Sequence, residues 1–413
     1  MRRWWTHNLT ILTANRSLRA LAMGYMNIVV PVYLVQLGFA PLKIGFLFTL
    51  AGLAGSLLSA AVGLAADRIG RRPFLIALPI LTALAGATYA LTTNFAFLAA
   101  ASALGTVGRG GAGGGGGGGP YMPVEQALTS DSCPSEARNS AFATLAFAGT
   151  LAAAGGAALT GVPAYLAAHH FSLLASYRPM FWATMAVGVG MALVSSQFHE
   201  TRRPPAPARQ RQLSVRSTDT VVKLSLTGAI NGLGFGFIQS FIPYWFYVRF
   251  GVGIARIGAL YVVLNLVSAL PYLLAPTIAR RLGAVRTITF TRVVGVGLLA
   301  LQPFMPTFTL AAAVYGLRMI FNTMAMPVRQ SYVMGIVDER ERSGVAGLSA
   351  VSTQAAAAAS PTIAGWMFQS VSLAMPFETA AGLQLLNAVL YYVFFASRRP
   401  PEEKRPATEV AAR

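Results

Sequence analysis

Charged residues are scarce in this sequence, and hydrophobic residues are correspondingly abundant. Only 11% of the 413 residues are charged, against about a quarter in an ordinary soluble domain. Hydrophobic residues make up 55% of the chain, and its mean hydropathy is +0.57. Apolar stretches of about 20 residues recur along the chain, each long enough to cross the hydrocarbon core of a bilayer. These features exclude an ordinary soluble protein and predict an all-α integral membrane protein.

Cysteine and catalytic motifs are also nearly absent. Cys133 is the single cysteine, so no intrachain disulfide can form. No Ser/His/Asp arrangement, metal-ligand spacing or phosphate-binding loop occurs, and we therefore expect no enzyme, no metal and no cofactor. We also expect no cleavable signal peptide, because Arg2 and Arg3 lead into a polar stretch through Arg16 and Arg19 rather than into a compact apolar core.

Basic residues cluster in alternate loops. Lys and Arg number 32 against 13 Asp and Glu, a formal net charge of +19. The basic loops are 68–72, 202–216, 280–286 and 398–405. This is the positive-inside pattern, so these loops are expected to face the cytoplasm and anionic lipid headgroups, and nucleic-acid binding is not expected. Arg outnumbers Lys by 29 to 3, which suggests a GC-rich prokaryote and placement in its cytoplasmic (inner) membrane.

Twelve transmembrane helices are predicted, with both termini in the cytoplasm. The expected spans are 17–37, 43–66, 74–93, 95–123, 140–166, 179–198, 220–248, 256–279, 287–305, 308–334, 343–371 and 379–397. A polar segment rich in Pro and Arg divides them. The predicted domains are a six-helix bundle over 1–198, a cytoplasmic linker over 199–219, a second six-helix bundle over 220–397 and a cytoplasmic tail over 398–413.

The two halves of the chain repeat one another. Matches recur in the same order at four places, and in one of them residues 122–126 (Met-Pro-Val-Glu-Gln) match residues 326–330 (Met-Pro-Val-Arg-Gln). That match sets Glu125 against Arg329. The repeat predicts two pseudo-symmetric bundles around a site near the bilayer midplane, which can rock against each other and give alternating access.

The loop after the second expected span has the sequence Gly63-Leu-Ala-Ala-Asp67-Arg68-Ile-Gly70-Arg71-Arg72. It resembles the signature between helices two and three of the major facilitator superfamily, and the number of spans, the duplication and the basic central loop agree. The resemblance implies the fold of that superfamily, most like its drug and metabolite efflux branch. It also implies a conformational latch formed by Gly63, Asp67, Arg68, Gly70, Arg71, Arg72 and Glu125.

The implied latch is electrostatic. Asp67 would lie at the N-terminus of the eleventh helix, where the helix dipole favours a carboxylate, and Arg71 would pair with Glu125 at the inner end of the fourth helix. Gly63 would let neighbouring helices approach closely, and Gly70 would allow a turn with positive φ. Such contacts exist only when the cytoplasmic side is closed, so they would favour the outward-open state.

Ionisable residues at membrane depth are costly and indicate function by default. Arg109 and Arg318 lie at similar depth in the fourth and tenth expected spans, where each either lines the cavity or is satisfied by helix carbonyls. No Asp, Glu or His falls mid-span, which disfavours simple proton antiport and leaves a facilitator, an anion exchanger, or coupling through Glu125. Polar residues expected to line the cavity, or else to bond between helices, are Tyr25, Asn27, Asn231, Gln239, Asn322 and Gln354.

A glycine tract, 110–119, is interrupted only by Ala112. No strand precedes it and no Gly-Lys-Ser/Thr ending follows, which disfavours a nucleotide-binding loop. The repeat places the tract inside the fourth expected span, and Gly costs about 1 kcal/mol against Ala in a helix interior. We therefore expect a bendable gating helix, with Gly114 and Gly116 as its gating glycines.

The function predicted from these features is secondary active transport of a small organic solute across the cytoplasmic membrane, by rocker-switch alternating access and in the efflux direction. One alternative is an organic-anion carrier or exchanger that uses Arg109 and Arg318. A second alternative is a non-transporting membrane receptor or assembly factor on the same fold. The expected partners are the solute, a coupling proton or counter-ion, and membrane lipids, and the chain is expected to act as a monomer.

Overall fold

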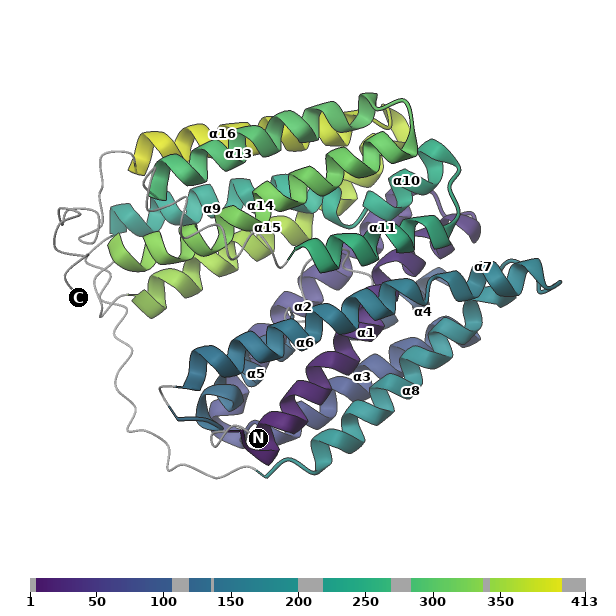
Figure 1. Ribbon diagram of the computed structural model, residues 1–413, viewed down its shortest axis with the longest axis horizontal. Coiled ribbons are helices and arrows are strands. Elements are labelled where there is room, and N and C mark those ends of the chain that lie inside the picture. The colour runs from purple at the N-terminus through teal and green to yellow at the C-terminus, as the bar shows by residue number, and fades with distance from the viewer. Residues whose placement is uncertain are drawn as a thin grey trace. The chain divides into compact units, whose positions relative to one another are not determined.

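Helices form almost all of the described structure, a computed structural model that covers residues 5–105, 119–134, 137–199, 218–268, 284–336 and 342–395 (Figure 1). These ranges contain no β-strand. Eight segments within them are long and apolar enough to cross a membrane by length and composition. The expected all-helical membrane fold is confirmed.

The helices follow the expected spans closely at most boundaries. The first half of the chain forms α1 (His7–Gln36), α2 (Pro41–Ile69), α3 (Arg72–Leu91), α4 (Phe95–Gly105), α5 (Tyr121–Asp131), α6 (Arg138–Ala158), α7 (Gly161–Ala168) and α8 (Arg178–Ser196). The second half forms α9 (Thr218–Gln239), α10 (Ile242–Phe250), α11 (Ile254–Val267), α13 (Ala284–Leu301), α14 (Phe308–Ile336), α15 (Arg342–Ser370) and α16 (Met375–Phe395). Short 3-10 helices, Ala175–Tyr177 and Gln302–Phe304, precede α8 and follow α13.

Helix α1 begins well before the expected first span, at His7 instead of residue 17. Thr6 caps it, because its side chain accepts a hydrogen bond from the backbone N–H of Leu9 at 3.3 Å. Asn15 and Arg19 are each only 4% exposed. The polar start of the chain therefore continues as helix, since its polar side chains find partners inside the bundle.

Helix α5 extends beyond the expected end of the fourth span, from residue 123 to Asp131. The Thr129 hydroxyl donates to the Glu125 carbonyl at 2.7 Å, and the Ser132 N–H caps the helix on the Leu128 carbonyl at 3.0 Å. Asp131, rather than Glu125, therefore stands at the end of this helix. Three residues singled out from the sequence lie outside the described residues: Arg109, Gly114 and Gly116.

Glycines set the close packing of α1 against α6. A Cβ added to Gly24 would lie 2.3 Å from the Ala153 carbonyl oxygen, and one added to Gly156 would lie 2.0 Å from the Leu21 carbonyl oxygen. No side chain fits at either position, so the two backbones approach as small residues allow between membrane helices. This contact anchors the long first helix on which part of the site stands.

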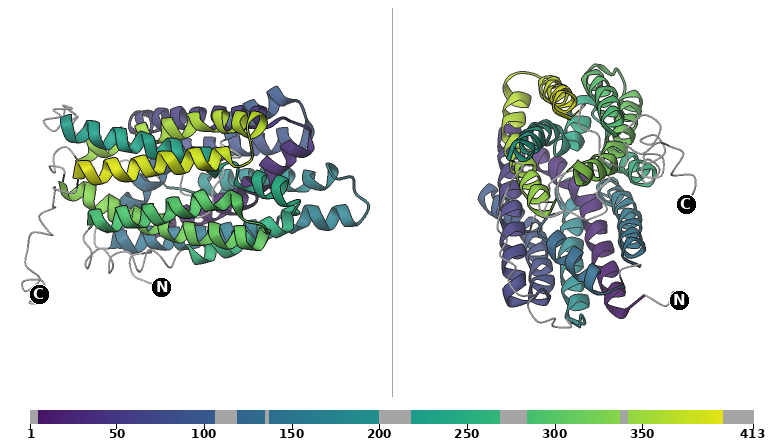
Figure 2. Two further views of the ribbon diagram at one scale, coloured as in Figure 1. Left: turned by 90° about the horizontal axis from the view of Figure 1, so that it is seen from above. Right: turned by 90° about the vertical axis from the view of Figure 1, so that its left-hand side faces the viewer.

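The described residues group into two compact units. The first unit contains the first half of the chain together with Gln239–Leu266 and Pro361–Val371, and the second contains the remainder. Within each unit the helices run alongside one another over much of their length (Figure 2). The first unit thus includes α10, most of α11 and the end of α15, three helices from the second half of the sequence.

Candidate functional site

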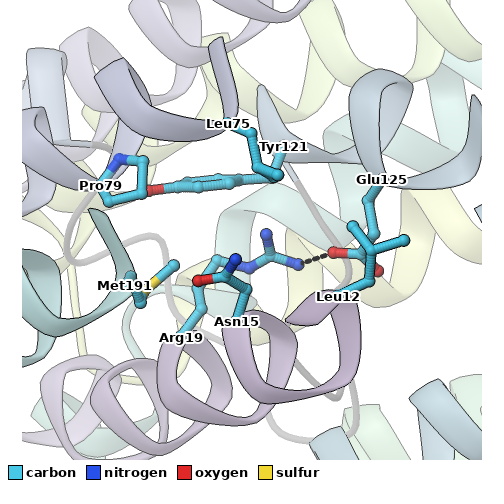
Figure 3. Close-up of a pocket in the computed structure, with 8 residues that line it drawn as sticks. All are labelled: Leu12, Asn15, Arg19, Leu75, Pro79, Tyr121, Glu125 and Met191. Atoms are coloured by element: carbon cyan, nitrogen blue, oxygen red, sulfur yellow. Dashed lines mark hydrogen bonds and ion pairs between the residues drawn. The ribbon is translucent and has the colours of Figure 1, made fainter. Parts of the chain in front are cut away.

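A buried cluster of opposite charges joins α1 to α5 in the first unit (Figure 3). The Glu125 carboxylate accepts hydrogen bonds from Arg16 and from Arg19, whose Nη2 lies 2.5 Å from Glu125 Oε2. The two arginines are three residues apart on α1 and so share one face of it. The Arg19 guanidinium also lies over the Tyr121 ring, with Cζ 4.3 Å from the centroid. Two cations and one anion leave this cluster with a net charge of +1.

A small cavity lies beside this ion pair. It is lined by Leu12, Asn15, Arg19, Leu75, Pro79, Tyr121, Glu125 and Met191 (Figure 3). Asn15 Nδ2 donates to Ser195 Oγ at 2.9 Å, whereas the buried Asn15 Oδ1 accepts no hydrogen bond from the described residues. The space suits about one water molecule. It is too small to hold an organic solute.

The prediction that Arg71 pairs with Glu125 is wrong. Arg71 Nη1 lies 2.5 Å from Asp131 Oδ2, and Glu125 is bound by α1 instead. The reason is the length of α5, because Asp131 stands six residues and about 9 Å beyond Glu125 along the helix. The Arg71–Asp131 pair is partly exposed, unlike the pairs of Glu125. The sequence signal for the pairs of Glu125 was the spacing of Arg16 and Arg19.

The other latch residues have mixed outcomes. Gly70 has a φ of 102°, which confirms the expected positive-φ turn. Among the described residues, a Cβ added to Gly63 would meet only the Pro123 Cβ at 3.8 Å, an ordinary contact, so the close approach expected there stays a prediction. Arg72 Nη2 donates to the Ser196 carbonyl at the end of α8, at 2.6 Å. Two side chains of the motif lie outside the described structure: those of Asp67 and Arg68.

The expected cavity residues fall in both units. Tyr25 is fully buried and its hydroxyl shares a hydrogen bond of 2.8 Å with Thr184 Oγ1 of α8, so in this structure it joins two helices rather than lining a cavity. Gln239 is 6% exposed and belongs to the first unit together with Asn27. The remaining three lie in the second unit, two of them half-buried and the last exposed: Asn231, Asn322 and Gln354.

Arg318 is a buried charge of the second unit. It stands ten residues after the start of α14 and is 3% exposed. At 1.5 Å per residue that is about 15 Å from the helix start, or about half the thickness of a bilayer core. Within the described ranges it forms no ion pair.

A second pair of arginines lies in the same unit. The Arg292 guanidinium of α13 lies over the Tyr391 ring of α16, with Cζ 5.5 Å from the centroid. Arg329 of α14 is close enough to act electrostatically on Arg292 and on Tyr391. Neither arginine forms an ion pair with a described residue. The sequence repeat set Arg329 against Glu125, so the charge at this repeated position is inverted; Arg292 was not predicted.

Helices from both halves of the sequence meet within the first unit, at the ends remote from the basic loops. A Cβ on Gly45 of α2 would lie 2.2 Å from the Pro361 carbonyl oxygen of α15. Beside them, the Thr362 hydroxyl donates to Thr49 Oγ1 at 2.8 Å. These contacts join α2 to the end of α15 within the first unit, at the helix ends that the charge pattern predicts to face outwards.

A duplicated bundle of membrane helices with a basic loop after the second helix defines the class as a multi-span carrier. A family model described as Major Facilitator Superfamily matches residues 12–319 and 292–413. The chain belongs to this superfamily. It is therefore a secondary transporter and a multi-pass membrane protein, and not an enzyme.

Individual relatives agree with this assignment. The chain is 25% identical over 398 residues to an uncharacterized membrane protein of Saccharomyces cerevisiae, with 87% of this chain and 88% of that protein covered. Its fold matches the nucleoside transporter NupG with a TM-score of 0.72 at 14% identity, covering 95% and 100% of the two chains. It also matches a bacterial homologue of the iron transporter ferroportin with a TM-score of 0.75 at 15% identity, covering 94% and 98%. At these identities the structural likeness shows the fold alone.

Proposed function

We propose that this transporter carries a small organic anion by alternating access, in the efflux direction. The observation that supports an anionic solute is Arg318, buried near the middle of α14 with no ion pair among the described residues. An Arg at the centre of a membrane helix costs about 3 kcal/mol on insertion scales. An anionic solute would supply the missing counter-charge while it is bound.

The scarcity of carboxylates in the second unit supports the same proposal. Its described acidic residues are Asp219 and Glu378. Asp219 binds Lys223 within α9 at 2.8 Å, and Glu378 stands in the first turn of α16, at the other end of that helix from Tyr391. Neither forms an ion pair with Arg318, so among the described residues no carboxylate supplies the counter-charge that a bound anionic solute would provide.

The transporter class rests on the family, whereas the charge of the solute and the direction of transport are the proposed parts. The two structural relatives are named for a nucleoside and for iron, so the fold carries chemically different solutes. The efflux direction rests on the overall likeness of the sequence to the drug and metabolite efflux branch, because the 63–72 motif is typical of the whole superfamily and not of one branch. Glu125 is already bound by two guanidiniums, and we therefore propose a counter-ion, rather than coupling through Glu125, as the driving partner.

Three further assignments remain proposals. The division into bundles at the 199–219 linker and the monomeric state rest on the sequence alone. Placement in a prokaryotic inner membrane, with both termini cytoplasmic, rests on the Arg usage and on the basic loops, while the relative named above is from yeast.

Ligand-dependent thermal unfolding of the purified chain tests the anionic solute. A ligand that binds only the folded protein raises its stability by about 2.7 kcal/mol at a hundred times its dissociation constant. We expect small carboxylates to raise the unfolding temperature of the wild type, and matched amides or amines to have no effect. Arg318→Gln should abolish the response, and Arg256→Gln, at an exposed site, should keep it.

Counterflow into proteoliposomes then checks that the stabilising anion is transported. Accumulation of labelled anion against unlabelled internal anion is expected for the wild type and for the Arg256 variant. Stabilisation by neutral or cationic compounds alone would contradict the anionic solute. Binding without any flux would instead support the non-transporting alternative.

A further inference from the structure

Side chains from three helices of the second unit converge near the basic loops. Arg292 lies on α13, Arg329 on α14 and Tyr391 on α16, and α13 packs against both of the other helices (Figure 1). Arg292 contacts the Tyr391 ring, and the charge of Arg329 acts on both. Each of the two arginine residues keeps part of its surface exposed in the described structure.

All three residues stand at a similar, shallow depth. Arg292 is eight residues after the start of α13, Arg329 seven before the end of α14 and Tyr391 four before the end of α16. These separations correspond to about 12, 10 and 6 Å from the helix ends next to the basic loops. Arg318 lies a further eleven residues along α14 from Arg329, or about 16 Å. The cluster is therefore separate from the proposed solute site.

The cluster offers hydrogen-bond donors and no described acceptor of opposite charge. The two guanidinium groups repel each other, and the ion pairs of the described structure include neither of them. Tyr391 is 1% exposed, and its buried hydroxyl has no hydrogen-bond partner in the described structure. Buried polar groups are nearly always satisfied, so an unpaired hydroxyl beside two cations indicates a missing acceptor.

Aromatic packing alone does not account for the arrangement. The Tyr391 ring contacts Tyr332 at 6.2 Å and Phe395 at 4.9 Å between centroids, which fixes the ring but leaves its hydroxyl unsatisfied. Contact with the ring face partly stabilises the Arg292 cation but offers nothing to Arg329. An oxyanion with several acceptor oxygens would satisfy both guanidinium groups and the hydroxyl together.

We propose that Arg292, Arg329 and Tyr391 form a binding site for a phosphate-type oxyanion in the second bundle, at the cytoplasmic end. The phosphate of an anionic lipid headgroup and a free phosphate present the same oxygens to this site. The shallow depth suits either source, because the donors lie close to the headgroup level of the leaflet that the basic loops face. Bound phosphate links three helices of the bundle, and it does so without contact to Arg318.

Thermal unfolding of the full-length chain, purified in detergent and stripped of lipid, tests the site. One arm adds inorganic phosphate, and the other adds phosphatidylglycerol, with phosphatidylcholine as the uncharged comparison. We expect the wild type and Arg286→Gln, an exposed residue of the same helix, to be stabilised in at least one arm. The double variant Arg292→Gln/Arg329→Gln should lose the response, and Arg318→Gln should keep it.

Two further variants keep the test decisive if the double variant does not fold. Tyr391→Phe removes only the hydroxyl and should weaken the apparent affinity on the order of tenfold, the worth of one hydrogen bond to a charged group. Asp338→Asn/Glu339→Gln neutralises two acids that follow α14 in the sequence and lie outside the described residues. If the site is open to ligand, this variant should respond like the wild type.

The outcomes separate the sources and the alternatives. A response to phosphate in lipid-free detergent identifies a free anion, and a response to phosphatidylglycerol alone identifies a headgroup; either supports the site. The proposal is overturned if neither stabilises the wild type, or if Tyr391→Phe and the double arginine variant respond as the wild type does. It is also overturned if only the Asp338/Glu339 variant responds, because those acids would then occupy the site.

Discussion

Each of the two compact units contains a cluster with two arginines. The positive charge of the arginines is balanced differently in the two clusters. In the first bundle, Arg16 and Arg19 close on Glu125. In the second, Arg292 lies over the ring of Tyr391 and Arg329 acts electrostatically on both, and neither arginine has an ion pair with a described carboxylate. The sequence repeat relates Glu125 to Arg329. By the proposal above, one inverted charge at a duplicated position separates a cluster that contains its own carboxylate from one that is open to an anion.

Glu125→Gln should have the largest effect on stability. It removes the carboxylate that binds the buried guanidinium of Arg19 and the partly buried one of Arg16. Breaking a buried ion pair in this way costs about 3–5 kcal/mol. We expect a sharp fall in the unfolding temperature, or no folded protein in the membrane fraction. Asp131→Asn is the control, since it breaks an ion pair that is partly exposed. Equal stability of Glu125→Gln and the wild type would show that the first cluster is not a closed charge centre.

Arg329→Glu should give the second cluster a carboxylate of its own, as Glu125 gives the first. The new carboxylate can pair with Arg292, and a hydrogen bond to a charged group is worth about 1.5–3 kcal/mol. Compared with Arg329→Gln, we therefore expect a higher unfolding temperature in the absence of ligand and no response to phosphate or phosphatidylglycerol. If Arg329→Glu still responded to phosphate as the wild type does, Arg329 would not be part of the site.

The Arg71–Asp131 pair should contribute least to stability. Exposed or partly exposed ion pairs contribute about 0–1 kcal/mol, so Arg71→Gln and Asp131→Asn should each shift the unfolding temperature only slightly. Their effect should appear in transport, because a latch changes the balance between two conformations rather than the folding of either. Thermal unfolding and counterflow on the same preparations would check this. A large loss of stability with normal flux would contradict the latch.

Sequence reasoning predicted the parts of the structure that depend on local signals. Apolar runs located most of the helices, and the glycine of the 63–72 motif indicated the turn that Gly70 makes with positive φ. The pairing of charges failed because it depends on where helices end and which faces meet. Ending the fourth span at residue 123 put Glu125 at the helix end, a place that Asp131 occupies.

The partners of Glu125 were not predicted either, because the start of the first helix was placed too late in the sequence. Starting the first span at residue 17 left Arg16 outside the membrane and Arg19 at its edge, although both lie in α1 and bind Glu125. The spacing of three residues was visible, but the partner more than a hundred residues away was not. Arg292 carried no signal of its own, because its neighbours come from α14 and α16.

The inverted charge is tested most directly by titrating phosphate, and separately phosphatidylglycerol, into purified wild type and Arg329→Glu while the unfolding temperature is followed. We predict that, without ligand, the wild type unfolds at a lower temperature than Arg329→Glu. Its unfolding temperature should rise when at least one of the two ligands is added. Arg329→Glu should start higher and stay level. Two results would contradict the claim that one inverted charge opens the second cluster to an anion. In one, the unfolding temperature of both proteins rises in parallel; in the other, neither changes with ligand and the wild type is the more stable.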